Sequence, residues 1–146
     1  MNRMENALAY HKKGYNCCQS VLAAFGDKYD ISEETALRIG AGFGGGAGTG
    51  ELCGAIIGGV MALDLILGGD VTSEPTEAKR RAAARAKALQ ARFLEQFGAL
   101  RCHELLKNEK EEPSDAVKAL GLEKHCDVMI ASAVEIVETI LSGEEK

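Results

Sequence analysis

The segment GFGGGAGTGELCGAIIGG, residues 42–59, places nine glycines around a single cysteine, Cys53. Its glycines recur every four residues from Gly42 to Gly58, a spacing that would form a helix face which another backbone can approach closely. The alternative is a flexible turn that leads into the N-terminus of a helix. Both interpretations make room around Cys53, and neither requires a ligand.

Two phosphate-binding patterns can be tested against the same segment. Residues 40–45 match G-x-G-x-x-G, but this motif needs a preceding strand, and the residues before Gly40 have helical spacing. The Walker pattern is absent, because no Gly-Lys-Ser or Gly-Lys-Thr follows the glycines. The glycine-rich segment therefore does not predict a nucleotide site.

Apolar residues recur with helical spacing along the whole chain, and no segment shows the sustained alternation of a half-buried strand. Asn16 and Ser32 are typical N-caps for two early helices. We therefore predict an all-α fold, a compact single-domain bundle of five to seven helices over residues 1–146. The predicted helices span about residues 4–13, 16–25, 32–39, 51–67 and 75–100, followed by a short helix after Pro113 and a last one over 122–140.

The longest predicted helix begins near Ser73 and Pro75. Its apolar residues follow one another in steps of three and four, which predicts a single buried stripe with a bend at Gly98. The stripe consists of Ala82, Ala86, Leu89, Phe93, Phe97 and Leu100.

Composition and charge argue against several kinds of partner. The net charge of -5 at pH 7 argues against nucleic acid, and the basic cluster at residues 79–81 is typical of a solvated helix face. The apolar stretch 52–67 is interrupted by Asp64 and is short for a bilayer, so we predict no stable membrane span. Residues 1–14 lack the apolar core of a signal peptide, and we expect a cytoplasmic protein.

Five cysteines are informative in a protein expected in the reducing cytosol, where cysteines serve as core residues, metal ligands or redox groups. None of them forms a C-x-x-C pair, so any joint site has to be assembled by the fold. Cys17 and Cys18 are adjacent and would lie about 100° apart on a helix, so they face different ways.

Cys53 stands at the predicted start of a helix, where the dipole and the free N–H groups lower the pKa of a thiol. Glu51 opposes this effect by like-charge repulsion. The simpler alternative is that Cys53 is a small buried residue. Cys126 lies in the apolar stripe of the last helix and Cys102 lies beside that of the longest one, as core cysteines would.

The order of the cysteines resembles a known family. Tyr15-Asn16-Cys17, the string GELCGAIIG at residues 50–58, and then Cys102 and Cys126 are similar to the family of redox-active proteins named for its C-GCAxxG-C-C motif. The resemblance runs from Tyr15 to about Ile140. It implies a small helical protein with a thiol redox role, whose family cysteines are Cys17, Cys53, Cys102 and Cys126. Cys18 departs from the family pattern.

Three functions are compatible with these residues. In the first, the four family cysteines converge near the start of the Cys53 helix as a thiol–disulfide relay or sensor, with Cys53 as nucleophile and a redox protein or small thiol as partner. Spacing does not decide which cysteines pair. In the second, the same thiols bind zinc or an iron–sulfur cluster, with His103 or His125 as further ligands. In the third, the protein is a helical homo-oligomer with structural cysteines.

Overall fold

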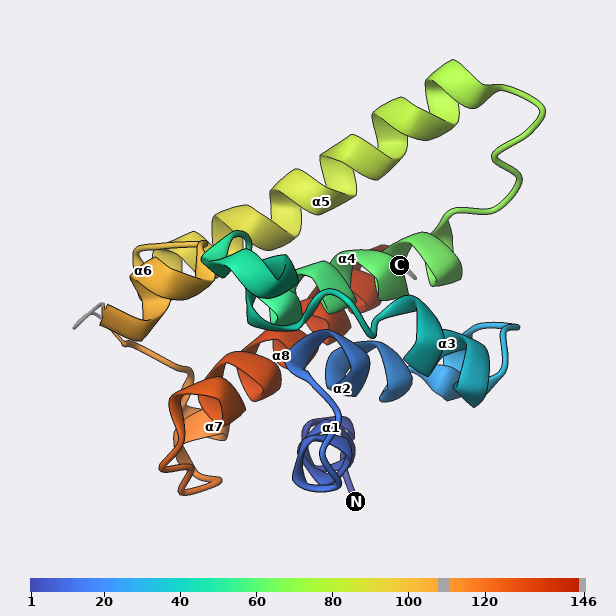
Figure 1. Ribbon diagram of the computed structural model, residues 1–146. Helices are drawn as coiled ribbons and strands as arrows, with labels where there is room; N and C mark the ends of the chain where they lie inside the picture. The colour runs from blue at the N-terminus through green and yellow to red at the C-terminus, as the bar shows by residue number, and fades with distance from the viewer. Residues whose placement is uncertain (108–110, 145–146) are drawn as a thin grey trace.

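Apart from one isolated two-residue bridge, the computed structural model is built from helices and turns over the residues it describes, 1–107 and 111–144 (Figure 1). The α-helices are α1 (Arg3–Lys12), α2 (Cys17–Ala23), α3 (Glu33–Ile39), α4 (Gly54–Leu67), α5 (Pro75–Phe97), α6 (Cys102–Lys107), α7 (Asp115–Lys118) and α8 (His125–Glu144). The predicted all-α class is confirmed. The described residues hold eight α-helices rather than five to seven, because the chain leaves the helix after Phe97 and begins a separate one at Cys102.

Side chains of Asn2, Asn16 and Ser32 cap α1, α2 and α3 by accepting a hydrogen bond from the backbone N–H three residues further on. At Asn16 the cap is reciprocal, because the Asn16 N–H donates to Gln19 Oε1 at 2.9 Å. The predicted caps at Asn16 and Ser32 are confirmed. The reciprocal cap fixes the start of α2 at Cys17.

The longest helix, α5, ends earlier than predicted. Gly98 has a φ of 73° and closes the helix in the left-handed conformation, with its N–H bonded to a carbonyl of the last turn at 2.7 Å. Gly98 therefore ends the helix instead of bending it, and Leu100 lies outside α5. Leu89, Phe93 and Phe97 are the buried residues of α5, and its N-terminal half projects from the body as an arm (Figure 1).

The core forms where α4 and α8 pack against each other and against α2 and α5. Glycines let α4 approach its neighbours closely. A Cβ on Gly58 would lie 2.6 Å from the Cys18 carbonyl oxygen of α2, and one on Gly59 would lie 2.8 Å from Leu89 Cδ1 of α5. The interpretation of the glycine spacing as a close-approach face is therefore confirmed for α4.

The earlier glycines form a turn, as in the alternative interpretation. They include η2 (Gly46–Gly50), a short π-type segment whose interior has non-helical backbone angles. Gly46 has a φ of 65°, and a Cβ there would clash with the backbone of Glu51, so no other residue fits this position. The glycine-rich segment is thus a turn up to Gly50 and a helix face from Gly54 onward.

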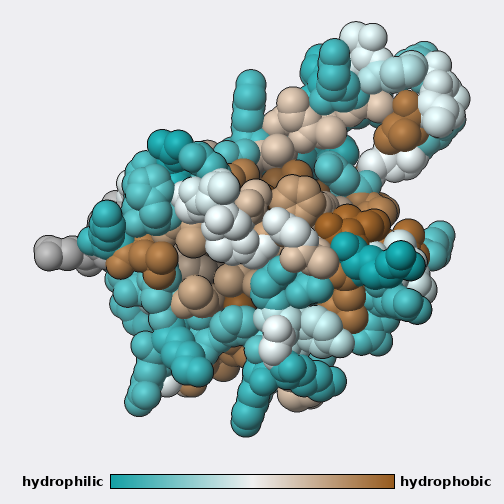
Figure 2. All heavy atoms as spheres, viewed as in Figure 1, coloured by the Kyte–Doolittle hydropathy of each residue, from teal (hydrophilic) through white to brown (hydrophobic). Residues whose placement is uncertain are grey.

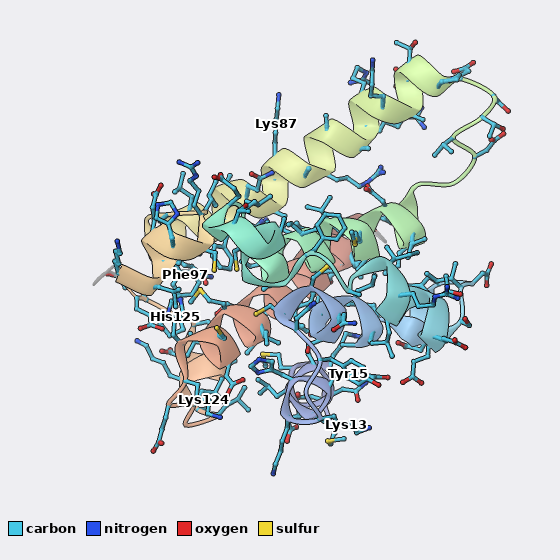
Figure 3. The ribbon with its side chains drawn as sticks, viewed as in Figure 1. Lys13, Tyr15, Lys87, Phe97, Lys124 and His125 are labelled. Atoms are coloured by element: carbon cyan, nitrogen blue, oxygen red, sulfur yellow. The ribbon has the colours of Figure 1, made fainter. Side chains whose placement is uncertain are left out.

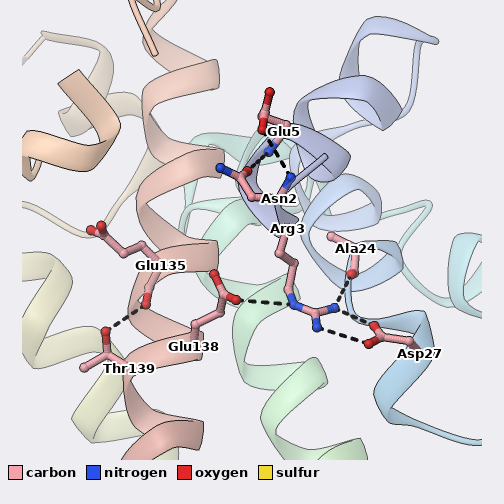
Figure 4. Close-up of polar contacts among 8 residues, drawn as sticks. All are labelled: Asn2, Arg3, Glu5, Ala24, Asp27, Glu135, Glu138 and Thr139. Atoms are coloured by element: carbon pink, nitrogen blue, oxygen red, sulfur yellow. Dashed lines mark hydrogen bonds and ion pairs between the residues drawn. The ribbon is translucent and has the colours of Figure 1, made fainter. Parts of the chain in front are cut away.

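Arg3 joins α1 to two other parts of the bundle (Figure 4). Its guanidinium donates to the Ala24 carbonyl oxygen at 2.7 Å and to the Asp27 carboxylate at 2.5 Å, and its Nε lies 3.5 Å from Glu138 of α8. These contacts hold α1 against the end of α2 and against α8.

On the face shown in Figure 2, hydrophilic side chains line the periphery, and hydrophobic side chains gather over the C-terminal part of α4. Leu65 of this helix is 40% exposed. Within residues 1–107 and 111–144, none of the helices combines the length and the apolar character that crossing a bilayer requires.

Candidate functional site

Four of the five cysteines line one small cavity of about 60 Å³. These are Cys17, Cys53, Cys102 and Cys126, the four that the sequence resemblance singles out. Figure 3 shows sulfur atoms (yellow) gathered near α6 and the start of α8, next to the labelled His125. The other residues lining the cavity are Gly45, Gly54, Leu105, Leu106, His125 and Met129, so its walls are largely apolar. The chemical role of these cysteines stays a prediction.

Each of the four cavity cysteines stands at the beginning of a helix. Cys17 and Cys102 are the first residues of α2 and α6, Cys53 is the N-cap of α4, and Cys126 is the second residue of α8. Because Cα–Cβ bonds tilt toward the N-terminus of a helix, side chains in the first turn point back toward that end. Four helices whose N-termini meet therefore bring their cysteines into one cavity.

A short bridge holds Cys53 beside Cys102. Leu52 and Arg101 oppose each other in the antiparallel sense. The N–H groups of Cys53 and Cys102 each donate to a carbonyl of the opposite segment, at 2.9 and 2.6 Å. Side chains alternate between the two sides of such a pair, which makes Cys53 and Cys102 diagonal neighbours on one side. Two residues are too few to show strand periodicity, so the sequence did not predict this bridge.

Two polar contacts reinforce the same junction. Arg101 Nη2 donates to Glu51 Oε2 at 2.6 Å, and His103 Nδ1 donates to the Gly50 carbonyl oxygen at 2.7 Å. His103, predicted as an additional metal ligand, thus holds α6 against the glycine turn and does not line the cavity. The other histidine of that prediction, His125, does line it.

Asn16 connects the first cavity cysteine to the glycine turn. While its Oδ1 caps α2, its Nδ2 donates to the carbonyl oxygens of Gly40 and Ala41 at 3.2 and 3.1 Å. A Cβ on Gly44 would lie 2.5 Å from Asn16 Cβ, so the turn passes directly over this side chain. The next residue, Gly45, forms part of the cavity wall.

The thiols of Cys17 and Cys126 interact inside the cavity, and this interaction separates their pKa values. It raises the pKa of Cys17, which burial raises further. It lowers the pKa of Cys126 to about 6, against the opposing effect of burial, and the imidazoles of His125 and His11 lower this pKa as well. Cys126 also lies at the N-terminal end of the 20-residue helix α8, whose dipole favours a negative charge. Cys126 is therefore the thiol that ionises first.

Cys53 has the opposite electrostatic environment. Its helix begins where the sequence predicts, at Gly54, but the side chain is only 5% exposed. Burial raises the pKa of Cys53 to about 11, and hydrogen bonds from the N–H groups of Ala55 and Ile56 offset only part of this rise. The expectation of Cys53 as nucleophile counted the helix terminus and left out this burial. Burial also raises the pKa of Cys102, the least enclosed of the four.

Cys18 lies outside the cavity. Its side chain is fully buried, and its thiol donates to Met61 Sδ at 3.8 Å. Burial, and then the proximity of Cys53, raise the pKa of Cys18 to about 12. The prediction that Cys17 and Cys18 face different ways is thus confirmed.

Sequence reasoning missed His11 of α1. His11 Nδ1 lies 2.7 Å from Asp127 Oδ1, in a partly buried pair that stands next to Cys126 in the chain. The two partners are 116 residues apart, and no local motif connects them. His125, on the other side of Cys126, has its Nδ1 3.7 Å from Glu111 Oε1. Imidazole groups therefore lie on two sides of Cys126.

Zinc and iron–sulfur sites need several Cys, His or carboxylate ligands arranged around one point. In the part of the chain that the structure describes, no group of three or more His, Cys, Asp or Glu side chains is arranged to hold a metal ion. The metal alternative therefore stays a prediction.

Comparison with known proteins agrees with the motif resemblance. The model of a family described as "Putative redox-active protein (C_GCAxxG_C_C)" matches residues 15–140. The matched span includes all four cavity cysteines. No curated protein and no solved structure gives a match to this chain.

Proposed function

The chain belongs to the C_GCAxxG_C_C family, and from this premise we propose that it is redox-active and that Cys126 and Cys17 form a reversible dithiol in which Cys126 is the nucleophile. Oxidation joins the two sulfur atoms and releases two protons and two electrons, and reduction returns them. The observation that carries the proposal is that the Cys17 and Cys126 thiols line one cavity, where their interaction raises the pKa of Cys17 and lowers that of Cys126 to about 6. A thiolate with an adjacent thiol is the arrangement that thiol–disulfide chemistry needs.

Cys53 and Cys102 form the second pair of the proposed relay. They hand two electrons and two protons to the Cys17–Cys126 disulfide, which returns to a dithiol as Cys53 and Cys102 become the disulfide. An external thiol, small or on a partner protein, then attacks Cys102, which forms a mixed disulfide with it while Cys53 leaves as the thiolate. A second thiol of the reductant attacks this mixed disulfide and frees Cys102. The position of the pair on one side of the two-residue bridge supports this exchange, as does the lesser enclosure of Cys102.

The test is a redox titration of the purified protein in dithiothreitol buffers, with free thiols counted and the disulfides located by peptide mass spectrometry. We expect the wild type to form the Cys17–Cys126 disulfide, and both Cys126→Ala and Cys17→Ala to lose that transition. Cys18→Ala is the matched control, because it removes an equal thiol from the same region of the fold without touching the cavity. Its titration should match the wild type.

Two results would contradict the proposal. One is that no disulfide forms at any potential while all thiols react only on unfolding. The other is that Cys126→Ala titrates like the wild type, since the first disulfide would then not involve Cys126.

A further inference from the structure

The cavity around the four thiols restricts what can reach them. Its volume of about 60 Å³ has room for only a few water molecules, since a site for one water needs about 10–15 Å³. A peptide, or a tripeptide thiol such as glutathione, is many times larger than this. Any reagent that meets Cys126 inside the cavity must therefore be very small.

We infer that the oxidant of the Cys17–Cys126 dithiol is hydrogen peroxide, which enters this cavity and reacts directly with Cys126. The inference rests on the proposed function and adds its substrate class. Hydrogen peroxide has nearly the size of two water molecules, so it matches the room available. It also accepts two electrons in one step, which is the number that a dithiol gives up in forming a disulfide.

The two steps balance with the groups that line the cavity. In the first, the Cys126 thiolate attacks one peroxide oxygen, the O–O bond breaks and hydroxide leaves, so that Cys126 becomes a sulfenic acid. In the second, Cys17 sulfur attacks the Cys126 sulfur, the S–O bond breaks, and the Cys17 proton leaves with the departing oxygen as water. The thiol that stabilises the Cys126 thiolate thus also resolves the sulfenic acid.

Two leucines set the size limit. Leu105 is 2% exposed and fixed in the core, whereas Leu106 lines the same cavity while its side chain is 61% exposed. Leu106 therefore forms the rim between the cavity and solvent. A bulky hydroperoxide such as tert-butyl hydroperoxide has to displace these side chains to bring its O–O bond to Cys126.

The experiment measures the rate of thiol loss in the protein with hydrogen peroxide and with tert-butyl hydroperoxide. Each rate is divided by the rate at which the same peroxide oxidises free cysteine, which corrects for the different reactivities of the two peroxides. We expect the relative rate of the wild type to be more than about tenfold higher with hydrogen peroxide. Tight pockets discriminate against additional alkyl groups by factors of this size. Leu106→Ala should narrow this preference for hydrogen peroxide, because it raises the tert-butyl hydroperoxide rate more than the hydrogen peroxide rate. Because Leu106 is exposed, this variant should fold normally.

Cysteine variants test the order of the two steps. Cys126→Ala should lose the fast reaction, whereas Cys17→Ala should keep the first step and accumulate a sulfenic acid on Cys126, which dimedone traps when it is added together with denaturant after the peroxide. Cys18→Ala should react like the wild type. Dimedone labelling of Cys53 or Cys102 in place of Cys126 would overturn the inference.

The two proposals fail in different ways. Dithiothreitol buffers could produce the Cys17–Cys126 disulfide while hydrogen peroxide reacts with the protein no faster than with free cysteine. This result would contradict hydrogen peroxide as the oxidant and would support the dithiol. Equal relative rates for the two peroxides would also contradict the proposal that hydrogen peroxide is the oxidant. If no disulfide forms with either oxidant, both proposals are wrong.

Discussion

Cys17 and Cys18 begin the same helix, yet they lie in two different regions of the molecule. Cys17 faces a cavity with three further thiols, and its interaction with one of them, Cys126, lowers the pKa of that thiol. Cys18 faces the core, where its thiol contacts Met61 and α4 lies close against its backbone. The comparison shows that a cysteine's chemistry follows from what its side of the helix meets. Adjacent positions in the sequence can therefore have unrelated functions.

The sharpest test of this difference is thiol reactivity. At pH 7 we expect hydrogen peroxide to oxidise Cys126 more than about a hundredfold faster than Cys18, because the pKa of Cys126 is lowered to about 6 while that of Cys18 is raised to about 12 and its thiol is buried. The rate at Cys126 should be high above its folded-state pKa and fall as the pH drops through about 6. Peptide mass spectrometry after timed quenching measures both sites. Equal rates at the two cysteines would show that the two regions do not differ as described.

A second test addresses the core side of α2. Gly58→Ala places a Cβ 2.6 Å from the Cys18 carbonyl oxygen, so α2 and α4 must move apart. We expect a loss of about 1–3 kcal/mol in the free energy of unfolding, measured by urea denaturation. The matched control is Gly143→Ala, which meets no atom within 4 Å in α8 and should stabilise the protein by up to about 1 kcal/mol. If both variants shift stability equally, the close contact of α2 and α4 does not constrain the fold.

Cys18→Ala should have a smaller effect on stability. Removing a buried sulfur and its contact with Met61 should cost about 1 kcal/mol, the scale of a lost core atom. Thermal denaturation measures this loss, and the redox titration should be unchanged. A shifted titration would mean that the core side and the cavity side are coupled through α2.

The smallest expected effect concerns His11, which acts on Cys126 from a distance. His11→Gln removes an imidazole that lowers the pKa of Cys126, so the pH profile of the Cys126 reaction with hydrogen peroxide should move to higher pH. The larger contribution from Cys17 is unchanged, and the shift should be much smaller than the one caused by Cys17→Ala. An unchanged profile in His11→Gln would remove this residue from the site.

The fold was predictable where local signals are strong. Asn16 and Ser32 predict the starts of their helices, because a capping side chain and its N–H partner are only three residues apart in the sequence. Gly98 was ambiguous, since glycine can bend a helix or end it, and only the backbone conformation distinguishes these outcomes. The extra helix α6 follows from this one difference.

The site was less predictable, because its geometry depends on contacts between distant residues. The resemblance identifies Cys17, Cys53, Cys102 and Cys126, but the cavity exists only where four helix N-termini meet. The expectation about Cys53 compared a helix dipole with a nearby carboxylate, whereas burial has the larger effect on its pKa. Burial of one residue by segments far away in the chain cannot be deduced from its neighbours in sequence.

The meeting of helix N-termini around Cys126 has a thermodynamic consequence. A thiolate that is stabilised in the folded protein lowers the free energy of the reduced form, and by linkage it raises the reduction potential of any disulfide that consumes it. The proposed Cys17–Cys126 couple is therefore on the oxidising side of ordinary structural disulfides, which resist reduction. Such a bond accepts electrons readily and adds little to holding the fold together, which suits a group that reports an oxidant and is then reset.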